Sequence, residues 1–117
     1  MHVHPLRNYL GFNNVDLHDG YLHAARYGNV PYRESQLVAD DYFYWLKQEL
    51  GADADVTDTG MECNSWVSRP WIYEEKYHPT NWVSTRSIDF LRRRDTSKPF
   101  FLMASYLRPH PPFDAPQ

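Results

Sequence analysis

Residues 98–117, KPFFLMASYLRPHPPFDAPQ, decide the fold that this sequence indicates. Residues 99–106 begin with a continuous apolar run, in which apolar and polar residues do not alternate. Such a run is typical of a strand buried on both faces of a parallel sheet. Arg108 and His110 follow it among prolines. In open α/β sheets, ligands bind beyond the carboxyl ends of strands. Arginine offers a forked donor for oxyanions, and histidine can donate a proton near neutral pH. Arg108 and His110 are therefore candidate site residues.

A plainer interpretation of this loop stays open. Pro109, Pro111 and Pro112 would stiffen a simple exit loop, in which His110 is half exposed and has no chemical role. The residue pattern alone favours neither interpretation.

Two helices are predicted before this stretch. Residues 35–50 place apolar side chains at helical spacing, and Gly51 follows as a typical C-terminal residue. Residues 80–94 form the second, with Thr80 as N-cap and three arginines at the negative end of the helix dipole. Helix, loop and buried strand make half of an α/β crossover unit. One strand cannot make a sheet, so we expect an α/β fold that is incomplete in this chain.

Composition narrows the class of protein. The chain has 117 residues and a formal net charge of −3, which leaves no basic footprint for nucleic acid. No apolar run reaches the length of a membrane span, so a membrane partner is not expected. A single cysteine, Cys63, excludes an internal disulfide framework and leaves the compartment undetermined.

Two further patterns resemble metal sites only superficially. His2 and His4 form an H-x-H pair, but no second cluster with metal-ligand spacing accompanies it. The acidic run ADAD at 52–55, with Asp58 after it, lacks the glycine and glutamate of a calcium loop, so we expect a solvated acidic turn. Cys63 is expected to be a small buried residue.

An aromatic stretch, residues 61–79, offers the remaining candidates. Asn64, Trp66 and Arg69 lie there together with further aromatic and acidic residues. Such a mixture suits a polar, sugar-like ligand. It suits a loop packed over a domain face equally well, and both interpretations stay open.

With these residues in view, the sequence resembles an internal segment of a type I sulfatase of the bacterial arylsulfatase or sulfohydrolase kind. The resemblance covers all of the chain. It is strongest in HPTNWVSTRSIDFLRRRDTSKPFFLMASYLRPHPPFDAP and in the opening MHVHPLRNYLGFNNVDLHDGYLH. The opening is similar to the segment after the lysine of the family's G-K-x-H motif, with His2 as the motif histidine.

The resemblance implies an alkaline-phosphatase-like α/β domain, a mixed sheet flanked by helices, of which residues 1–117 would be one internal segment. It implies hydrolysis of sulfate esters or sulfamates, with carbohydrates as the expected substrates, by a formylglycine beside a calcium ion. His2 would contact the formylglycine, and His110 would bind the sulfate and assist the leaving group. Arg108, Asn64, Trp66 and Arg69 are the expected substrate-binding residues.

Several parts of the family pattern are missing from this chain. CNSWV, which begins at Cys63, departs from the C/S-x-P/A-x-R motif of the nucleophile at its third and fifth positions. The calcium ligands and both motif lysines are absent, so no residue of this chain is expected to bind metal and the chain alone is expected to be inactive. The expected partners are a sulfated small molecule or glycan and the remainder of the same domain.

Two alternative functions stay open. One is a phosphonate or phosphate-ester hydrolase of the same superfamily. The other is a non-enzymatic module that binds glycans through Trp66, Trp71 and Trp82.

Overall fold

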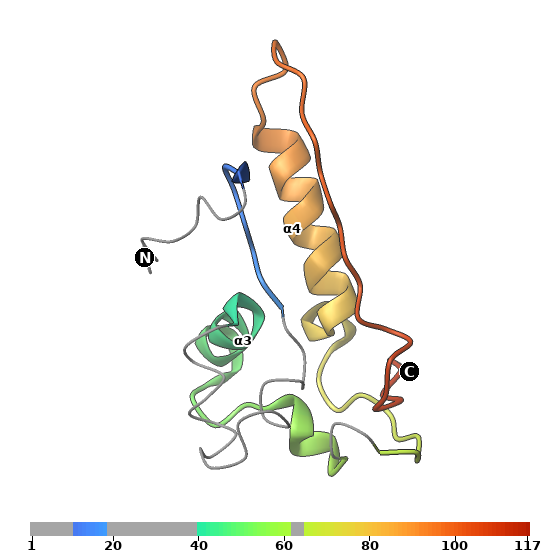
Figure 1. The fold of residues 1–117 in the computed structure, drawn as a ribbon. Coiled ribbons are helices and arrows are strands. Elements are labelled where there is room, and N and C mark those ends of the chain that lie inside the picture. Colours follow the sequence, from blue (N-terminus) through green and yellow to red (C-terminus); the bar gives the residue numbers. More distant parts are fainter. Residues whose placement is uncertain (1–10, 19–39, 62–64) are drawn as a thin grey trace.

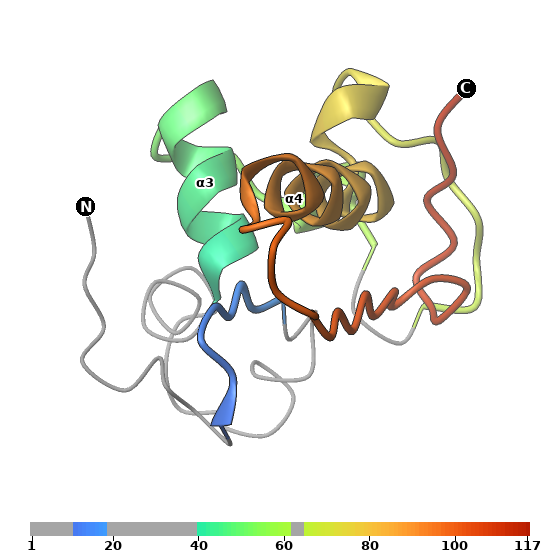
Figure 2. The same ribbon diagram turned by 90° about the horizontal axis from the view of Figure 1, so that it is seen from above.

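The structure, a computed structural model, describes residues 11–18, 40–61 and 65–117 (Figure 1). These ranges contain two α-helices, α3 (Asp41–Leu50) and α4 (Pro79–Arg93), and two 3₁₀ turns, η2 (Val56–Thr59) and η3 (Glu75–Tyr77). Seen along α4, helix α3 and the C-terminal end of the chain lie on opposite sides of α4 (Figure 2). None of the helices in these ranges combines the length and the apolarity that crossing a bilayer requires.

Helix α3 confirms the second part of the first predicted helix, while residues 35–39 lie outside the described ranges. Asp40 caps its start, because its Oδ1 accepts a hydrogen bond from the Phe43 backbone N–H at 3.1 Å. The same carboxylate pairs with the buried His18 ring, Oδ2 to Nδ1, at 3.0 Å. Gly51 ends the helix with φ +106°, a conformation that favours glycine.

Helix α4 confirms the second predicted helix to within one residue at each end, but the predicted cap was wrong. The N-cap is His78, whose Nδ1 accepts from the Thr80 backbone N–H at 3.2 Å. Pro79 follows at the first helical position, where its missing N–H costs no hydrogen bond. Arg92 and Arg93 occupy the last turn, as the helix dipole favours.

The loop after α3 is the expected solvated acidic turn only in its first part, because residues 51–53 are exposed and residues 54–56 are buried. Asp55 is fully buried, and Ala54 beside it is also buried. Lys47 contributes, since its Nζ donates to the carbonyls of Ala52 at 3.0 Å and Ala54 at 2.8 Å. These two bonds hold the loop against its own helix.

An aromatic core joins the two helices. The Tyr42 ring lies 5.6 Å from Trp82 of α4 and 4.5 Å from His18, measured between centroids. Its hydroxyl donates to the Tyr77 carbonyl at 2.8 Å. Edge-to-face contacts of this kind add to the area that aromatic rings bury. The core therefore fixes α3 against the start of α4.

The predicted strand at 99–106 is not a strand in the described structure, and its predicted burial on both faces is wrong here. The segment runs back along α4 in extended form (Figure 1), with Phe100 against Phe90 at 5.9 Å and Tyr106 against Ser84. Phe101 remains 72% exposed and Met103 68%. The described ranges offer no neighbouring strand to cover these side chains. The only β pairing among them is an isolated parallel bridge, so the sheet is not seen.

Candidate functional site

The loop that carries Arg108 and His110 packs against residues 68–71. The isolated parallel bridge joins Ser68 to Phe113. The Arg69 backbone N–H donates to the Phe113 carbonyl at 3.1 Å, and the Trp71 N–H donates to the Ala115 carbonyl at 3.0 Å. The aromatic stretch and the proline-rich loop, which are far apart in the sequence, are thus neighbours.

Arg108 closes this loop on itself. Its Nε donates to Oδ1 of Asp114 at 2.8 Å, and one terminal nitrogen donates to Oδ2 at 2.7 Å. Two parallel charge-assisted bonds are the strongest arrangement that arginine and a carboxylate form. The Asp114 side chain is wholly buried and that of Arg108 is 14% exposed.

His78 approaches the same carboxylate from helix α4. Its Nε2 lies 3.8 Å from Oδ1 of Asp114, and both side chains are buried. Since Nδ1 accepts from the Thr80 N–H, the neutral ring carries its proton on Nε2, toward Asp114. Burial raises the pKa of Asp114, but the nearby His78 ring and Arg108 guanidinium lower it by more, so the pKa of Asp114 lies below its usual range.

His110 is exposed at the tip of the loop. Its Nδ1 lies 2.7 Å from the Pro111 carbonyl, and its backbone N–H donates to the Leu107 carbonyl at 3.0 Å. A carbonyl can only accept, so Nδ1 carries a proton and Nε2 is the ring nitrogen offered to a ligand. The imidazole is therefore oriented for contact with a group outside the loop.

Two of the other predicted site residues, Trp66 and Arg69, lie in the described ranges, and the hydrogen bond of the Arg69 side chain there does not reach His110. Trp66 is 91% exposed. The Arg69 guanidinium donates to the Thr59 carbonyl at 3.2 Å. His2 and Asn64, like Cys63, lie outside the described ranges. Two of the three tryptophans in the glycan-binding alternative, Trp71 and Trp82, are buried, so their rings are not exposed for stacking on a sugar.

Sequence reasoning missed Asp114 and His78. The sequence held a weak signal for the ion pair of Asp114, because Arg108 and Asp114 flank the proline-rich loop. Nothing in the pattern around His78 indicated that its ring would face a carboxylate from another part of the chain.

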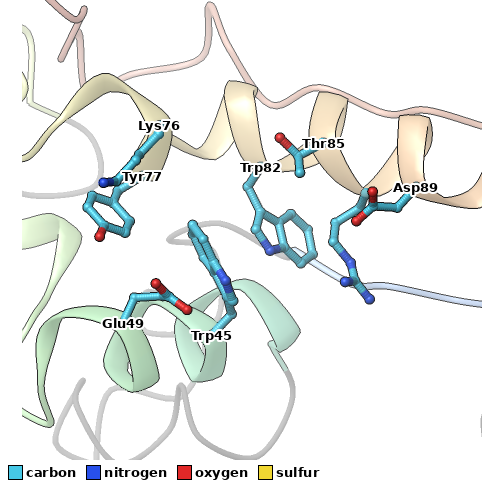
Figure 3. Close-up of a pocket in the computed structure, with 8 residues that line it drawn as sticks. Trp45, Glu49, Lys76, Tyr77, Trp82, Thr85 and Asp89 are labelled. Atoms are coloured by element: carbon cyan, nitrogen blue, oxygen red, sulfur yellow. The ribbon is translucent and has the colours of Figure 1, made fainter.

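A separate cavity of about 230 Å³ lies between α3 and α4 (Figure 3). Its walls combine aromatic rings with charged groups, among them Trp45, Tyr77, Glu49, Lys76 and Asp89. Trp82, one of the tryptophans in the glycan-binding alternative, lines it, whereas His110, Arg108, Trp66 and Arg69 do not. Within the described ranges, no three histidine, cysteine or acidic side chains come together as a metal site.

Comparison with known proteins identifies a relative of this chain. No family model matches the sequence. An arylsulfatase from Clostridium perfringens (strain 13 / Type A) is 57% identical over 119 aligned residues, which cover 100% of this chain and 24% of that protein. The chain thus spans about a quarter of the length of the curated relative that it matches.

Proposed function

Since this chain belongs to the sulfatase family, we propose that the protein containing it is a sulfuric ester hydrolase that acts on sulfate esters or sulfamates of carbohydrates. The observation that carries the proposal is the identity of 57% to an arylsulfatase along the whole chain. The matched region covers the whole chain and so includes the proline-rich loop, where His110 is exposed.

In this proposal His110 is the group that contacts the sulfate and assists the leaving group. Breaking the sulfur–oxygen bond leaves an alkoxide, which departs readily only if it receives a proton. The protonated imidazole can supply that proton from Nε2 while Nδ1 stays bonded to the Pro111 carbonyl. His2 would contact the nucleophile, and Asn64, Trp66 and Arg69 would bind the rest of the substrate.

Calcium and formylglycine belong to the chemistry that the family implies. Together they would supply the nucleophile and neutralise the charge on the sulfate. The described residues do not fit a calcium site, because they bring no cluster of three potential ligands together. In this proposal both groups are held by the remainder of the domain.

The test is made in the full-length sulfatase that carries this chain. We expect His110→Ala to lower kcat/KM by about a hundredfold or more, because a positioned proton donor contributes on this order. The loss should be larger for alkyl or sugar sulfates than for aryl sulfates with good leaving groups. Arg92→Ala, at the exposed end of α4, is the control and should keep normal rates. Hydrolysis of phosphate or phosphonate esters in preference to sulfate esters would refute the proposal.

A further inference from the structure

We propose that Asp114 is a positioning residue, which acts with Arg108 and His78 to hold the His110 loop in its reactive position. We call these three side chains the Asp114 anchor. The inference rests on the proposed function and deepens it. It also gives Arg108 a role different from the substrate contact predicted from the sequence, namely to hold Asp114.

The Arg108 guanidinium is directed at Asp114. Its Nε and one terminal nitrogen are both committed to Asp114, at 2.8 and 2.7 Å. A side chain that is 14% exposed and paired in this way faces into the protein. Releasing it to bind an anion would leave the Asp114 carboxylate buried without its main partner, which is costly.

The Asp114 carboxylate faces the His78 ring at the start of α4. His78 begins α4, and its ring is fixed by the Thr80 N–H and by an edge-on contact with Trp71 at 5.2 Å. Its Nε2 has no hydrogen-bond partner within the described structure and lies 3.8 Å from the Asp114 carboxylate. The carboxylate thus meets a rigid helix end on one side and the Arg108 guanidinium on the other.

His110 is fixed by its own loop. Both hydrogen bonds that it makes in the described structure stay inside its own loop, to Pro111 and Leu107. The loop itself is therefore what must be held. Arg108 lies two residues before His110 and Asp114 four residues after it, so the anchor holds the loop on both flanks.

The consequence for the reaction comes from geometry. A displacement of about 1 Å in a reacting group can cost up to about a hundredfold in rate. Loosening the loop would therefore lower kcat, since proton transfer occurs in the transition state, and would raise KM only as far as the contact of His110 with the sulfate is weakened. Loss of a sulfate-binding arginine would instead raise KM even in a His110→Ala background.

The experiment is a double-mutant cycle in the full-length sulfatase, with an aryl and an alkyl sulfate as substrates. We expect Asp114→Asn to lower kcat by about tenfold or more, with the larger loss on the alkyl sulfate. The fall in kcat caused by Asp114→Asn should vanish in a His110→Ala background, because Asp114 acts only through His110. Arg108→Lys should reproduce Asp114→Asn, and Asp95→Asn, an exposed aspartate in a turn, should have no effect.

Two outcomes overturn the inference. Additive losses in the double variant would show that Asp114 does not act through His110. A rise in KM for Arg108→Lys that persists in the His110→Ala background would make Arg108 a substrate ligand. If Asp114→Asn fails to fold, Arg108→Lys alone carries the cycle with His110→Ala, and the same two outcomes decide. A wild type without sulfatase activity would refute the proposed function itself, whereas an active wild type with additive losses would refute only the anchor.

Discussion

At the scale of single residues, two glycines show that backbone geometry and neighbouring side chains contribute separately to the free-energy cost of a substitution. Gly51 and Gly60 both have positive φ, +106° and +75°. A Cβ on Gly51 would meet nothing within 4 Å, whereas one on Gly60 would stand 2.7 Å from the Arg69 guanidinium. That guanidinium is the flexible end of a side chain, held by its bond to the Thr59 carbonyl at 3.2 Å. It can swing away, at the cost of that bond.

We therefore predict that Gly51→Ala lowers the free energy of unfolding by about 1–3 kcal/mol through backbone strain alone. In Gly60→Ala the lost hydrogen bond should add about 0.5–1.5 kcal/mol to the strain of that position itself. In an Arg69→Ala background the extra cost should disappear. Urea denaturation of these variants measures this. Equal costs for Gly60→Ala in both backgrounds would show that Arg69 plays no part.

At the scale of elements, the start of α4 and the C-terminal segment are joined through one carboxylate. Asp114 has a pKa below its usual range because His78 and Arg108 outweigh the effect of burial. A carboxylate whose folded pKa is depressed stabilises the fold while it is ionised. The contribution is complete at neutral pH, and it is lost as the pH falls below about 4 and through the folded pKa.

The prediction is that stability falls more steeply in the wild type than in Asp114→Asn as the pH falls below about 4. Unfolding free energies measured by urea titration at each pH test this. Glu49→Gln removes an exposed carboxylate of α3 and should keep the wild-type pH dependence. Parallel curves for the wild type and Asp114→Asn would mean that the carboxylate has no favourable partner in the folded state.

At the scale of the whole molecule, the main feature is an apolar segment with no cover in the described ranges. Phe101 and Met103 are mostly exposed, and the α4 residues Val83, Phe90 and Leu91 are only partly buried. An extended segment with open N–H and C=O groups is a site for pairing with another chain. Because the relative is about four times longer than this chain, the remainder of the domain is the expected cover.

Hydrogen exchange tests this expectation. Amides of residues 100–104 should exchange rapidly in the dilute isolated chain and slowly in the longer protein, where neighbouring strands would bond them. The isolated chain should also associate as its concentration rises. Strong protection of these amides in a monomer, independent of concentration, would mean that the segment is already paired within this chain.

Activity gives a second test at this scale. The isolated chain should not hydrolyse an aryl sulfate, with or without calcium, because the described residues hold no metal cluster and the chain has no C/S-x-P/A-x-R nucleophile motif. Calcium should leave its melting temperature unchanged. Turnover that is abolished by His110→Ala would contradict this expectation.

What the sequence determined by itself was local. The helical periodicity and the glycine at 51 placed the end of the first helix, and the arginines at 92 and 93 placed the end of the second. These features depend on residues within a few positions of one another, so a one-dimensional pattern carries them. The motifs of the opening and of the proline-rich loop also indicated the sulfatase family, to which the chain belongs.

Only the tertiary structure decided which polar groups are buried together. Lys47 helps to turn part of an acidic loop inward, and His78 replaces Thr80 as a cap because its ring lies between the helix start and Asp114. The partners of Asp114 lie 6 and 36 positions away, and a buried charge finds its partners through packing, which sequence spacing does not encode. The segment at 99–106 shows the reverse case. Its pattern indicates a buried strand, and burial needs neighbours that the described part of this chain does not place beside it.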